Sequence, residues 1–593
     1  MTHLHCIKEP VVKDNRFLPT IQGREWRWAI VWSLVILAIT SLPYLYGALI
    51  TTPELHFGGF LIGVEDGNSY LAKMRLGAMG NWKFHLFYTS EPHEGAYLLL
   101  FHLLLGKLAV WSGLTLIQMY HLARLVCGLI LMLTVYCFAA FFTQVRSVRR
   151  LVFWLVGTGS GLGWLVLWLG LPDGLGLPLD FYSPEAFAFH LLFGLPHLSL
   201  TMALLLWAIL FILLAWERQQ WRYTWLAGFA LLGMTFLAAF YIIVAAAVIG
   251  VTWLLRIWTS QWESNSATRP GSSNVNLSGD VEMVVPKHAP KSIFIQGWWR
   301  EAWQATLAFG IAAPVPLYNA YVFSTNPIFK IWASQNRILS PMPVHYLLAF
   351  GVLAIPAVIG AWREWQSGSQ RTLLLIGWCV VIPFLLYIPF NLQRRMALGF
   401  QVALSVLAGV GLWQIWISRI RPAREGLPEA GETMRGWRFI SIGLVALLSL
   451  SNLMILIGAG LTISARAIPI FQPDTQIEAA DWLGANATAD QVVLAAYENG
   501  NYLPTRMSAR VFLGHGPETA YSDMKRTLVT QFFASDNDDF RRQLLQDYNI
   551  TFLYYGPAEQ ALGGFAPGDA FYLRGIYDNG TVQIYQVTDV IEP

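Results

Sequence analysis

The apolar positions of this chain come in long runs that are separated by short polar stretches. A helix needs about 20 apolar residues to cross the hydrocarbon core of a bilayer. Runs that reach or approach this length are 28–50, 117–142, 151–170, 197–215, 299–320, 344–362, 372–390, 396–417 and 438–461. The stretch 225–257 is too long for one crossing, so we divide it near Phe240-Tyr241 into two short helices. The pattern therefore predicts eleven membrane-spanning helices.

The segment 95–113 is also apolar, but it contains His102, Gly106 and Lys107. We interpret it as an interfacial helix, because counting it as a crossing would disturb the distribution of lysine and arginine between the two sides of the membrane. The composition agrees with lipid as the solvent, since 55% of the residues are hydrophobic and 13% are charged, and the mean hydropathy is +0.47. A net charge of +3 creates no field that would attract nucleic acid, so we expect no nucleic-acid partner.

Lysine and arginine are distributed unevenly between the two sides that eleven crossings define. With the N-terminus inside, the inner pieces and their edges hold 22 of the 39, the outer connections hold nine, and the segment 462–593 holds eight. Such an inner excess sets the orientation of membrane proteins. The sequence therefore predicts a multi-pass cell-membrane protein with a cytoplasmic N-terminus. Its transmembrane domain covers 1–461, with an outer loop at 51–116 and a flexible cytoplasmic loop at 259–290.

The segment 462–593 has a different pattern and is predicted to lie outside the cell. TQIEAADWLGANA and DDFRRQLLQDY are typical of helices, whereas QVVLAA, ITFLYY and TVQIYQV are typical of short strands. The fold class is thus a polytopic α-helical membrane protein with a small extracytoplasmic α/β domain.

Ionisable residues gather on the predicted outer side, where nine of the twelve histidines fall. Such groups are costly beside hydrocarbon and tend to mark function. In the first outer loop, Glu65-Asp66 precedes an amphipathic stretch from Ser69 to Met79, whose apolar residues we expect to lie on the membrane. A carboxylate at headgroup level can act as a general base towards an acceptor hydroxyl. An Asp-Gly turn or a helix cap would explain the same residues.

A second candidate site is the outer turn that contains Gln393, Arg394 and Arg395. Two arginines on the outer side depart from the rule that lysine and arginine gather on the inner side. Bidentate binding of a lipid phosphate would explain their presence. Ordinary headgroup contact is the alternative. Weaker candidates of the same kind are Arg124, Lys330 and Arg337.

A third candidate is His197, which follows Pro196 at the mouth of the fourth predicted span. Such a histidine can donate a hydrogen bond, transfer protons or bind a metal. The alternative is a histidine that only caps the helix or bonds to the backbone.

Taken in order, these motifs resemble the GT-C glycosyltransferase superfamily, in the branch of protein O-mannosyltransferases and aminoarabinose transferases. The chain is also similar to large bacterial membrane proteins of unassigned specificity that share this core. The resemblance rests on Glu65-Asp66, Glu91-Pro92-His93-Glu94, Arg124, Gln393-Arg394-Arg395 and the terminal block NITFLYYGPAEQALGGF with GTVQIYQV. It covers most of the chain, although each motif is short.

The resemblance implies that Asp66 is the catalytic base, because the first-loop aspartate has that role in the superfamily. The family's acidic pair usually reads Asp-Glu, whereas here it reads Glu-Asp, so Glu65 and Asp66 could exchange roles. A WWD-type motif is absent, so transfer of a whole oligosaccharide to asparagine is not expected. Further candidates for substrate contacts are Glu91, His93, His197, Lys330 and Arg337.

The implied donor is a sugar on a polyprenyl phosphate in the membrane, and its acceptor is a glycan, a lipid or a protein. Arg394, Arg395, Gln393 and Arg124 would bind the donor phosphate. No cofactor is required, and a divalent metal at Asp66, Glu65 and a histidine stays open. A non-catalytic protein that binds or transports lipid-linked sugars in envelope assembly is the main alternative. Few charged residues fall mid-span, which argues against a transporter.

Overall fold

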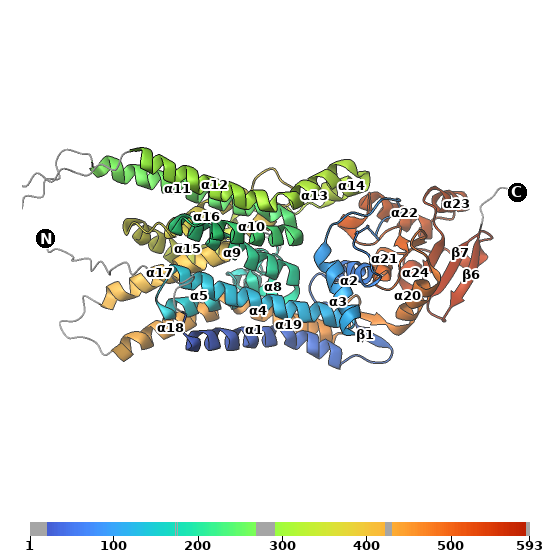
Figure 1. Ribbon diagram of the computed structural model, residues 1–593. Helices are drawn as coiled ribbons and strands as arrows, with labels where there is room; N and C mark the ends of the chain where they lie inside the picture. The colour runs from blue at the N-terminus through green and yellow to red at the C-terminus, as the bar shows by residue number, and fades with distance from the viewer. Residues whose placement is uncertain (1–20, 172–173, 175, 268–290, 421–429, 589–593) are drawn as a thin grey trace, which may run out of the picture.

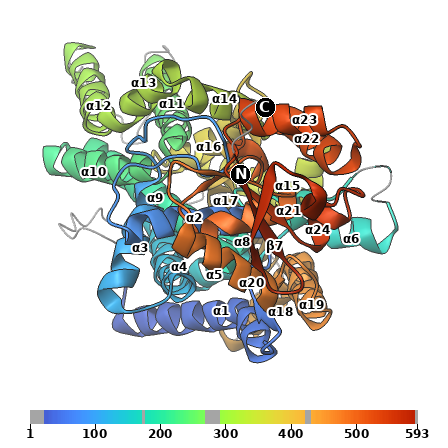
Figure 2. The same cartoon turned by 90° about the vertical axis from the view of Figure 1, so that its right-hand side faces the viewer.

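The computed structural model describes residues 21–171, 174, 176–267, 291–420 and 430–588. Its long helices lie side by side in an elongated bundle, and the strands of the C-terminal segment gather at one end (Figure 1). Viewed from that end, the C-terminal helices and strands lie in front of the bundle (Figure 2). The chain is therefore mostly helical, with a separate sheet layer at one end.

Within the described residues, six helices are long and apolar enough to cross a membrane, and two bent pairs bring the number to eight. The six are α1 (Gly23–Leu49), α4 (Leu116–Phe142), α9 (Pro196–Arg218), the run Trp221–Gln261, α15 (Pro343–Gln366) and Gln393–Arg419, which includes most of α17 (Phe400–Ile420). The bent pairs are α12 (Lys291–Ala312) with α13 (Pro314–Thr325), and α18 (Ala430–Leu448) with α19 (Leu450–Ser464). These spans support a multi-pass membrane protein. The eleven crossings predicted from the sequence exceed these eight at three places. These are the short helix α16 (Thr372–Leu385), the run Trp221–Gln261, which counts here as one span, and the segment 151–170.

The run Trp221–Gln261 reverses direction where the sequence pattern predicts a break. It consists of α10 (Trp221–Ala238), the 3-10 turn η2 (Ala239–Tyr241) and α11 (Ile242–Ala267). The Gln219 carbonyl accepts a hydrogen bond from Arg300, and Arg256 pairs with Glu301 at 2.7 Å. One straight helix would hold Gln219 and Arg256 roughly 55 Å apart, at about 1.5 Å per residue. Both contact neighbouring residues of α12 instead, so α10 and α11 are antiparallel.

The prediction of one helix over 151–170 is wrong. The segment contains the end of α5 (Arg146–Thr158), a turn, and the short helix α6 (Gly163–Trp168). The buried Asp180 carboxylate accepts hydrogen bonds from the backbone of Gly161 (2.8 Å) and Gly163 (2.9 Å), and from the Ser451 hydroxyl (2.8 Å). Closely spaced glycines make the turn accessible. Hydropathy does not detect such a break, because the turn residues are themselves apolar.

The predicted flexible loop 259–290 is described only at its start, where α11 continues to Ala267. The remainder, 268–290, lies outside the described residues.

The C-terminal segment contains a five-stranded sheet in the order β4-β3-β5-β7-β6. Its strands are β3 (Val492–Leu494), β4 (Arg510–Val511), β5 (Phe552–Tyr555), β6 (Leu573–Asp578) and β7 (Gln583–Val587). Strand β3 is parallel to β4 and β5, whereas β7 is antiparallel to β5 and β6. The helices here are α20 (Asp474–Asn486), α21 (Tyr497–Tyr502), α22 (Ser522–Ala534), α23 (Asp538–Asp547) and α24 (Pro557–Gln560).

The C-terminal segment packs directly on the first loop of the chain, which holds α2 (Val64–Ala78) and α3 (Leu100–Ser112). Strand β1 (Leu55–Phe57) pairs antiparallel with β2 (Phe471–Pro473). The Val511 backbone donates a hydrogen bond to the Phe87 carbonyl at 2.8 Å. Ala72 and Leu76 share a buried apolar cluster with Leu483 and Val493. These contacts join loop and sheet into one packed unit.

Helix α3 has 13 residues and is therefore about 20 Å long, too short to cross a bilayer. Other short elements are η1 (Leu179–Phe181), α8 (Ala188–Gly194), α14 (Pro327–Gln335), η3 (Gln393–Ala397), η5 (Leu503–Thr505), η6 (Gly516–Glu518) and η7 (Pro567–Asp569).

Candidate active site

Asp66 lies in the first turn of α2, where the helix dipole favours negative charge. Its Oδ1 atom is 3.1 Å from Nε2 of His515, which donates a hydrogen bond in the matching tautomer. The Asp66 side chain stays 59% exposed. Among the described residues no donor bonds to Oδ2, so this oxygen can accept a hydrogen bond from a substrate.

The apolar side of α2 faces protein rather than lipid. Leu71 and Met74 are buried in a cluster with Leu105 of α3 and Met119 of α4. Met79 alone of the expected membrane-facing positions is strongly exposed, at 54%. The expectation that this face lies on the membrane is therefore wrong for Leu71 and Met74, because α3 and α4 cover it.

The polar side of α2 is covered by the turn from His515 to Glu518. The Glu518 carboxylate is 2.6 Å from Nζ of Lys73 and accepts a hydrogen bond from the Ser69 hydroxyl at 2.8 Å. Lys73 also donates to Ser69, and its side chain and that of Glu518 are buried. Nδ1 of His515 lies 3.8 Å from Glu518, so the imidazole sits between two carboxylates.

The surroundings of Asp66 keep it ionised. Partial enclosure by protein raises the pKa of Asp66, but the hydrogen bond from His515 and the nearby charges of Arg395 and Lys73 outweigh it. The net effect holds the pKa of Asp66 below its ordinary value of 3.8. Burial likewise raises the pKa of Glu518, and Lys73 and His515 together bring it below its ordinary value. Both carboxylates are therefore charged at neutral pH.

Glu65 points to a different partner from its neighbour. Tyr497 of α21 donates a hydrogen bond to Glu65 at 2.8 Å and accepts one from the Gly516 backbone at 3.1 Å. The Arg526 guanidinium lies over the Tyr497 ring, 3.7 Å from its centroid. Of the two members of the acidic pair, Glu65 is thus bound to the C-terminal segment and Asp66 keeps an open oxygen.

Arg395 belongs to the same region as Asp66, since its charge lowers the Asp66 pKa. It lies in η3, with Nε 3.5 Å from the buried Glu185 carboxylate and its guanidinium over the Phe240 ring at 5.6 Å. The neighbouring Arg394 lies over the Tyr182 ring at 4.8 Å. Nε of Arg394 and Nε of Arg395 make no hydrogen bond to any described residue. Both guanidinium groups therefore keep donors for a ligand.

Gln393 shapes this turn. Its Oε1 atom accepts the Ser340 backbone N–H at 3.2 Å, and its Nε2 atom donates to the Ile388 carbonyl at 2.6 Å. These two bonds hold the turn that carries the arginines. The side chain amide is therefore occupied by backbone partners.

Aromatic rings stand beside the two charged groups. Tyr70 stacks on His102 at 4.6 Å, and His197 meets both rings edge-on, at 5.3 Å and 5.1 Å. Both ring nitrogens of His102, Nδ1 of His197 and the Tyr241 hydroxyl are buried without a hydrogen bond to a described residue. A buried polar atom without a partner costs about 1–3 kcal/mol. Several together indicate a place where a ligand supplies the partners.

Arg124 does not join this cluster of open donors. Its guanidinium donates to the Thr40 and Ser41 hydroxyls, to the Leu192 carbonyl and to His121. The side chain is only 2% exposed. These bonds link α1, α4 and α8, so they favour a structural role over phosphate binding.

Glu91 and His93 hold the first loop in place. Glu91 pairs with the fully buried Lys525 at 2.7 Å, and burial lowers the pKa of Lys525 to about 8 although Glu91 opposes this. His93 accepts the Leu86 backbone N–H at 2.9 Å. Lys330 of α14 and the nearby Arg337 are exposed. Glu91 and His93 thus have partners within the protein, whereas Lys330 and Arg337 lie at the surface.

The arrangement of the whole chain can be compared with known proteins. No protein-family model and no curated protein matches the sequence. The oligosaccharyltransferase AglB of Archaeoglobus fulgidus, solved with an inhibitory peptide and a dolichol-phosphate, aligns over 96% of this chain and 75% of its own, at 12% identity and a TM-score of 0.51. The arabinofuranosyltransferase AftD from Mycobacteria aligns over 97% of this chain and 40% of its own, at 14% identity and a TM-score of 0.51. The chain has the GT-C fold. The aminoarabinose transferase ArnT of Cupriavidus metallidurans aligns over 94% of this GT-C chain and 98% of its own, at 12% identity and a TM-score of 0.43.

In the described part of this GT-C chain, no three His, Cys, Asp or Glu side chains are placed to hold a metal ion. Asp66 and His515 together offer two ligands. Of the residues that could hold a divalent metal, Glu65 turns away from Asp66 and His515 to its partner Tyr497.

Two residues of the site, Lys73 and Glu518, escaped sequence reasoning. Glu185 and His515 were counted only among the ionisable residues of the predicted outer side, without a role of their own. Lys73 follows Asp66 by seven positions, which is two helical turns, so the spacing alone could have placed it on the same face. His515 and Glu518 carry no local signal, because their partners lie in the first loop.

Proposed function

We propose that this GT-C chain is a membrane glycosyltransferase that moves a sugar from a polyprenyl-phosphate donor to an acceptor hydroxyl at the outer face of the membrane. One observation carries the proposal: Asp66 keeps a carboxylate oxygen, and Arg394 an Nε donor, without a hydrogen bond to a described residue, and the charge of Arg395 reaches Asp66. Glycosyl transfer from a phosphate needs a carboxylate on the acceptor side and a cation on the phosphate side. This site supplies both.

The donor phosphate binds at Arg394 and Arg395 in this proposal. The Nε of Arg394 makes no hydrogen bond to a described residue, and that of Arg395 has only the ion pair with Glu185 at 3.5 Å. Guanidinium groups bind phosphate oxygens through two parallel hydrogen bonds, so both side chains suit a phosphate. AglB was solved with a dolichol-phosphate, which supports a lipid phosphate as a ligand of this fold. The stacked pair of Tyr70 and His102 offers an aromatic surface for the sugar ring.

The reaction then proceeds by one displacement. The acceptor oxygen attacks the anomeric carbon while the bond from that carbon to the phosphate oxygen breaks. The electron pair of that bond leaves with the polyprenyl phosphate, whose added negative charge Arg394 and Arg395 stabilise. The hydroxyl proton passes to Oδ2 of Asp66. Because attack and departure occur on opposite faces, the sugar inverts its anomeric configuration.

A carboxylate with a low pKa is a weak base, so the timing of proton transfer matters. An alcohol oxygen becomes strongly acidic only when it has bonded to the anomeric carbon. Asp66 therefore acts first as an ionised hydrogen-bond acceptor that orients the hydroxyl, and takes the proton late. His515 holds the Asp66 carboxylate in place through Oδ1 and is a positioning residue.

The test is sugar transfer by the full chain in nanodiscs, with a panel of synthetic polyprenyl-phosphate sugars as donors and envelope extract as acceptor. Asp66→Asn keeps the shape of the side chain but removes the base, so we expect the transfer rate to fall by about 10²–10⁴-fold. Mass spectrometry of released polyprenyl phosphate and glycosylated product measures this rate.

Glu65→Gln is the matched control, because Glu65 contacts Tyr497 instead of the proposed substrate position. It should retain most of the activity. Transfer by Asp66→Asn at the parental rate would remove Asp66 as the base. Donor binding by the parental protein without transfer to any acceptor would favour a non-catalytic binding or transport protein.

A further inference from the structure

Helices α5 and α18 lie at the end of the bundle opposite the C-terminal sheet (Figure 1). A cavity of about 840 Å³ is lined by residues of both helices. One face of each helix lines it, together with Trp28 of α1 and Trp413 of α17. The lining residues of the two helices are Arg146, Ser147, Arg150, Leu151, Trp154, Met434, Trp437, Arg438, Ser441, Ile442, Val445 and Ala446. The cavity is therefore separate from the site around Asp66.

The cavity is polar at one end and apolar at the other. Helices α5 and α18 run parallel, since the Ser160 backbone just after α5 donates a hydrogen bond to Leu448 at the end of α18. Arg146 and Arg150 near the start of α5 and Arg438 of α18 therefore lie towards the same end. The lining residues Trp154, Val445 and Ala446 follow deeper in the bundle.

The charged end has more positive than negative groups. Arg146 pairs with the buried Glu25 at 3.2 Å but stays 53% exposed. Glu25 is also bound by Arg149 at 3.0 Å, outside the cavity lining. No described carboxylate pairs with Arg150 or Arg438, and Arg150 lies over the Trp28 ring at 5.0 Å. An anion is the ligand that this arrangement favours.

Two further features point to an amphipathic ligand. The hydroxyl of Ser441 is buried beside the cavity without a hydrogen bond to a described residue. Trp413 and Trp437 meet edge-on at 4.9 Å, and tryptophan is the residue that favours the level between headgroups and acyl chains. The cavity thus combines a cationic mouth, a hydroxyl without a hydrogen bond and an apolar wall.

We propose that this cavity binds one anionic phospholipid of the leaflet at that end of the bundle. Arg146, Arg150 and Arg438 contact the phosphate and its charged headgroup, and Ser441 donates a hydrogen bond to a glycerol ester. An acyl chain lies along Trp154 and Val445. The order of charge, hydroxyl and apolar wall along the cavity matches the order of these groups in a phospholipid. The sequence predicts that this end is cytoplasmic, where membranes carry anionic lipids.

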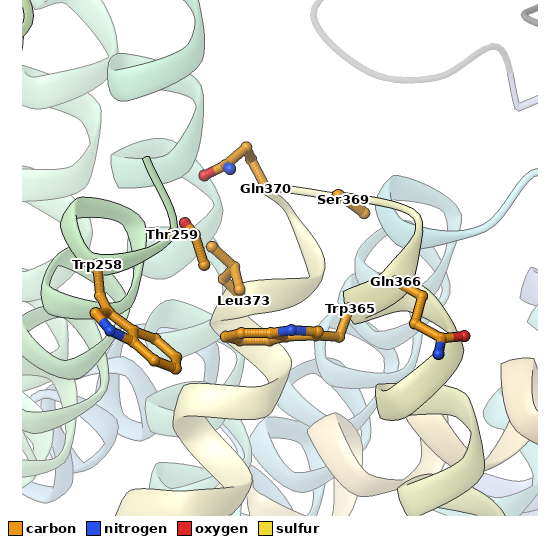
Figure 3. Close-up of a pocket in the computed structure, with 8 residues that line it drawn as sticks. Trp258, Thr259, Trp365, Gln366, Ser369, Gln370 and Leu373 are labelled. Atoms are coloured by element: carbon orange, nitrogen blue, oxygen red, sulfur yellow. The ribbon is translucent and has the colours of Figure 1, made fainter. Parts of the chain in front are cut away.

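A second cavity at this end of the bundle differs from the first in its lining. It has a volume of about 330 Å³ and lies where Trp258 faces Trp365 (Figure 3). Its lining includes Gln366, Ser369 and Gln370 but no charged side chain. It therefore lacks the cationic mouth on which the proposal rests.

The experiment measures lipid binding to the delipidated full chain by native mass spectrometry. The probes are dioleoyl phosphatidylglycerol, dioleoyl phosphatidylcholine and free glycerol phosphate. We expect phosphatidylglycerol to bind at least about tenfold more tightly than phosphatidylcholine, because only the former brings net negative charge to the arginines. Arg150→Gln with Arg438→Gln should remove this preference. Ala446→Phe keeps the charges but fills the apolar part, and should weaken both lipids.

The control variant Arg27→Gln with Arg363→Gln removes two exposed charges outside the cavity lining. It should keep the preference for phosphatidylglycerol, and the melting temperatures of all variants should stay within a few degrees. The proposal would be overturned if the parental protein bound both lipids equally, or if the control variant lost the preference for phosphatidylglycerol as well. Free glycerol phosphate that binds as tightly as the lipid would also overturn it.

Discussion

Asp66 depends on a residue that follows it by 449 positions, because His515 supplies the hydrogen bond that keeps it ionised and in place. Arg395 and Lys73 add positive charge nearby. The chemistry at residue scale is therefore a carboxylate that stays charged, orients a hydroxyl and accepts its proton late. The neighbouring carboxylate of Glu65 does not share this role, because it accepts a hydrogen bond from Tyr497 instead.

The pH dependence of transfer should report this arrangement. The pKa of Asp66 lies below 3.8 in the folded protein, so the active ionised form persists as pH falls until it reaches that value. His515→Ala removes a hydrogen bond that lowers the pKa of Asp66, so protonation and loss of activity should begin at a higher pH than in the parental protein. The measurement is kcat/KM between pH 3 and 8, a range that reaches the acid limb of the parental protein.

Tyr497→Phe serves as the control, because Tyr497 bonds to Glu65 and not to Asp66. The acid limb of this variant should coincide with that of the parental protein. Identical acid limbs for His515→Ala and the parental protein would show that His515 does not set the charge of Asp66.

Sequence reasoning could find Asp66 and Arg395 because each stands out in its own segment. Asp66 follows the first long apolar run, and Arg395 lies in an outer turn where positive charge is unexpected. The same reasoning selected Arg124, whose donors are satisfied by Thr40, Ser41 and Leu192. Only tertiary contacts distinguish an arginine with open donors from one that links helices.

At the scale of elements, the position of Asp66 depends on how closely α2 packs on α3. A Cβ atom at Gly106 would lie 1.8 Å from the Met74 carbonyl, and one at Gly77 would lie 2.0 Å from the Leu103 carbonyl. The two backbones therefore touch at these glycines. Any side chain there must push α2 away from α3.

Gly106→Ala should move α2 and misplace Asp66. Overpacking of this kind costs about 1–3 kcal/mol, and a misplacement of about 1 Å can reduce a rate by about 10²-fold. We expect a lower melting temperature and a lower transfer rate. Gly351→Ala in α15, where no atom lies within 4 Å of the new Cβ, should change neither. Equal behaviour of the two variants would contradict the dependence on close packing.

Hydropathy predicted α1, α4 and α9 well because each is a continuous apolar run. It failed at 151–170, where apolar residues and glycines form a turn around Asp180. Strands β3, β5 and β7 fall inside the segments predicted from alternating apolar residues. Their order in the sheet had no sequence signal, because it depends on which strands pair across long connections.

At the scale of the whole molecule, the C-terminal segment completes the site that the first loop begins. His515 and Glu518 both reach α2, and strand β2 pairs with β1 of the loop. The loop and the sheet must therefore lie on the same side of the membrane. The sidedness predicted from lysine and arginine places them outside.

Cysteine labelling tests this orientation. In a background where Cys6, Cys127, Cys137 and Cys379 are serine, Glu498→Cys should react with an impermeant maleimide in intact cells. Both Glu498 and Arg363 are exposed in the folded chain. Arg363→Cys should react only after the membrane is permeabilised, because it lies on the predicted inner side. The opposite pattern would place the site in the cytoplasm and contradict transfer at the outer face.

The central claim is that Asp66 and Arg395 serve one reaction, and a cryo-EM structure with bound undecaprenyl phosphate tests it most directly. We predict phosphate density in contact with Arg395, within roughly 10 Å of Asp66, so that a sugar would bridge the two. The density should be lost in Arg395→Gln. Phosphate bound at another place while Arg394 and Arg395 stay empty would contradict the account.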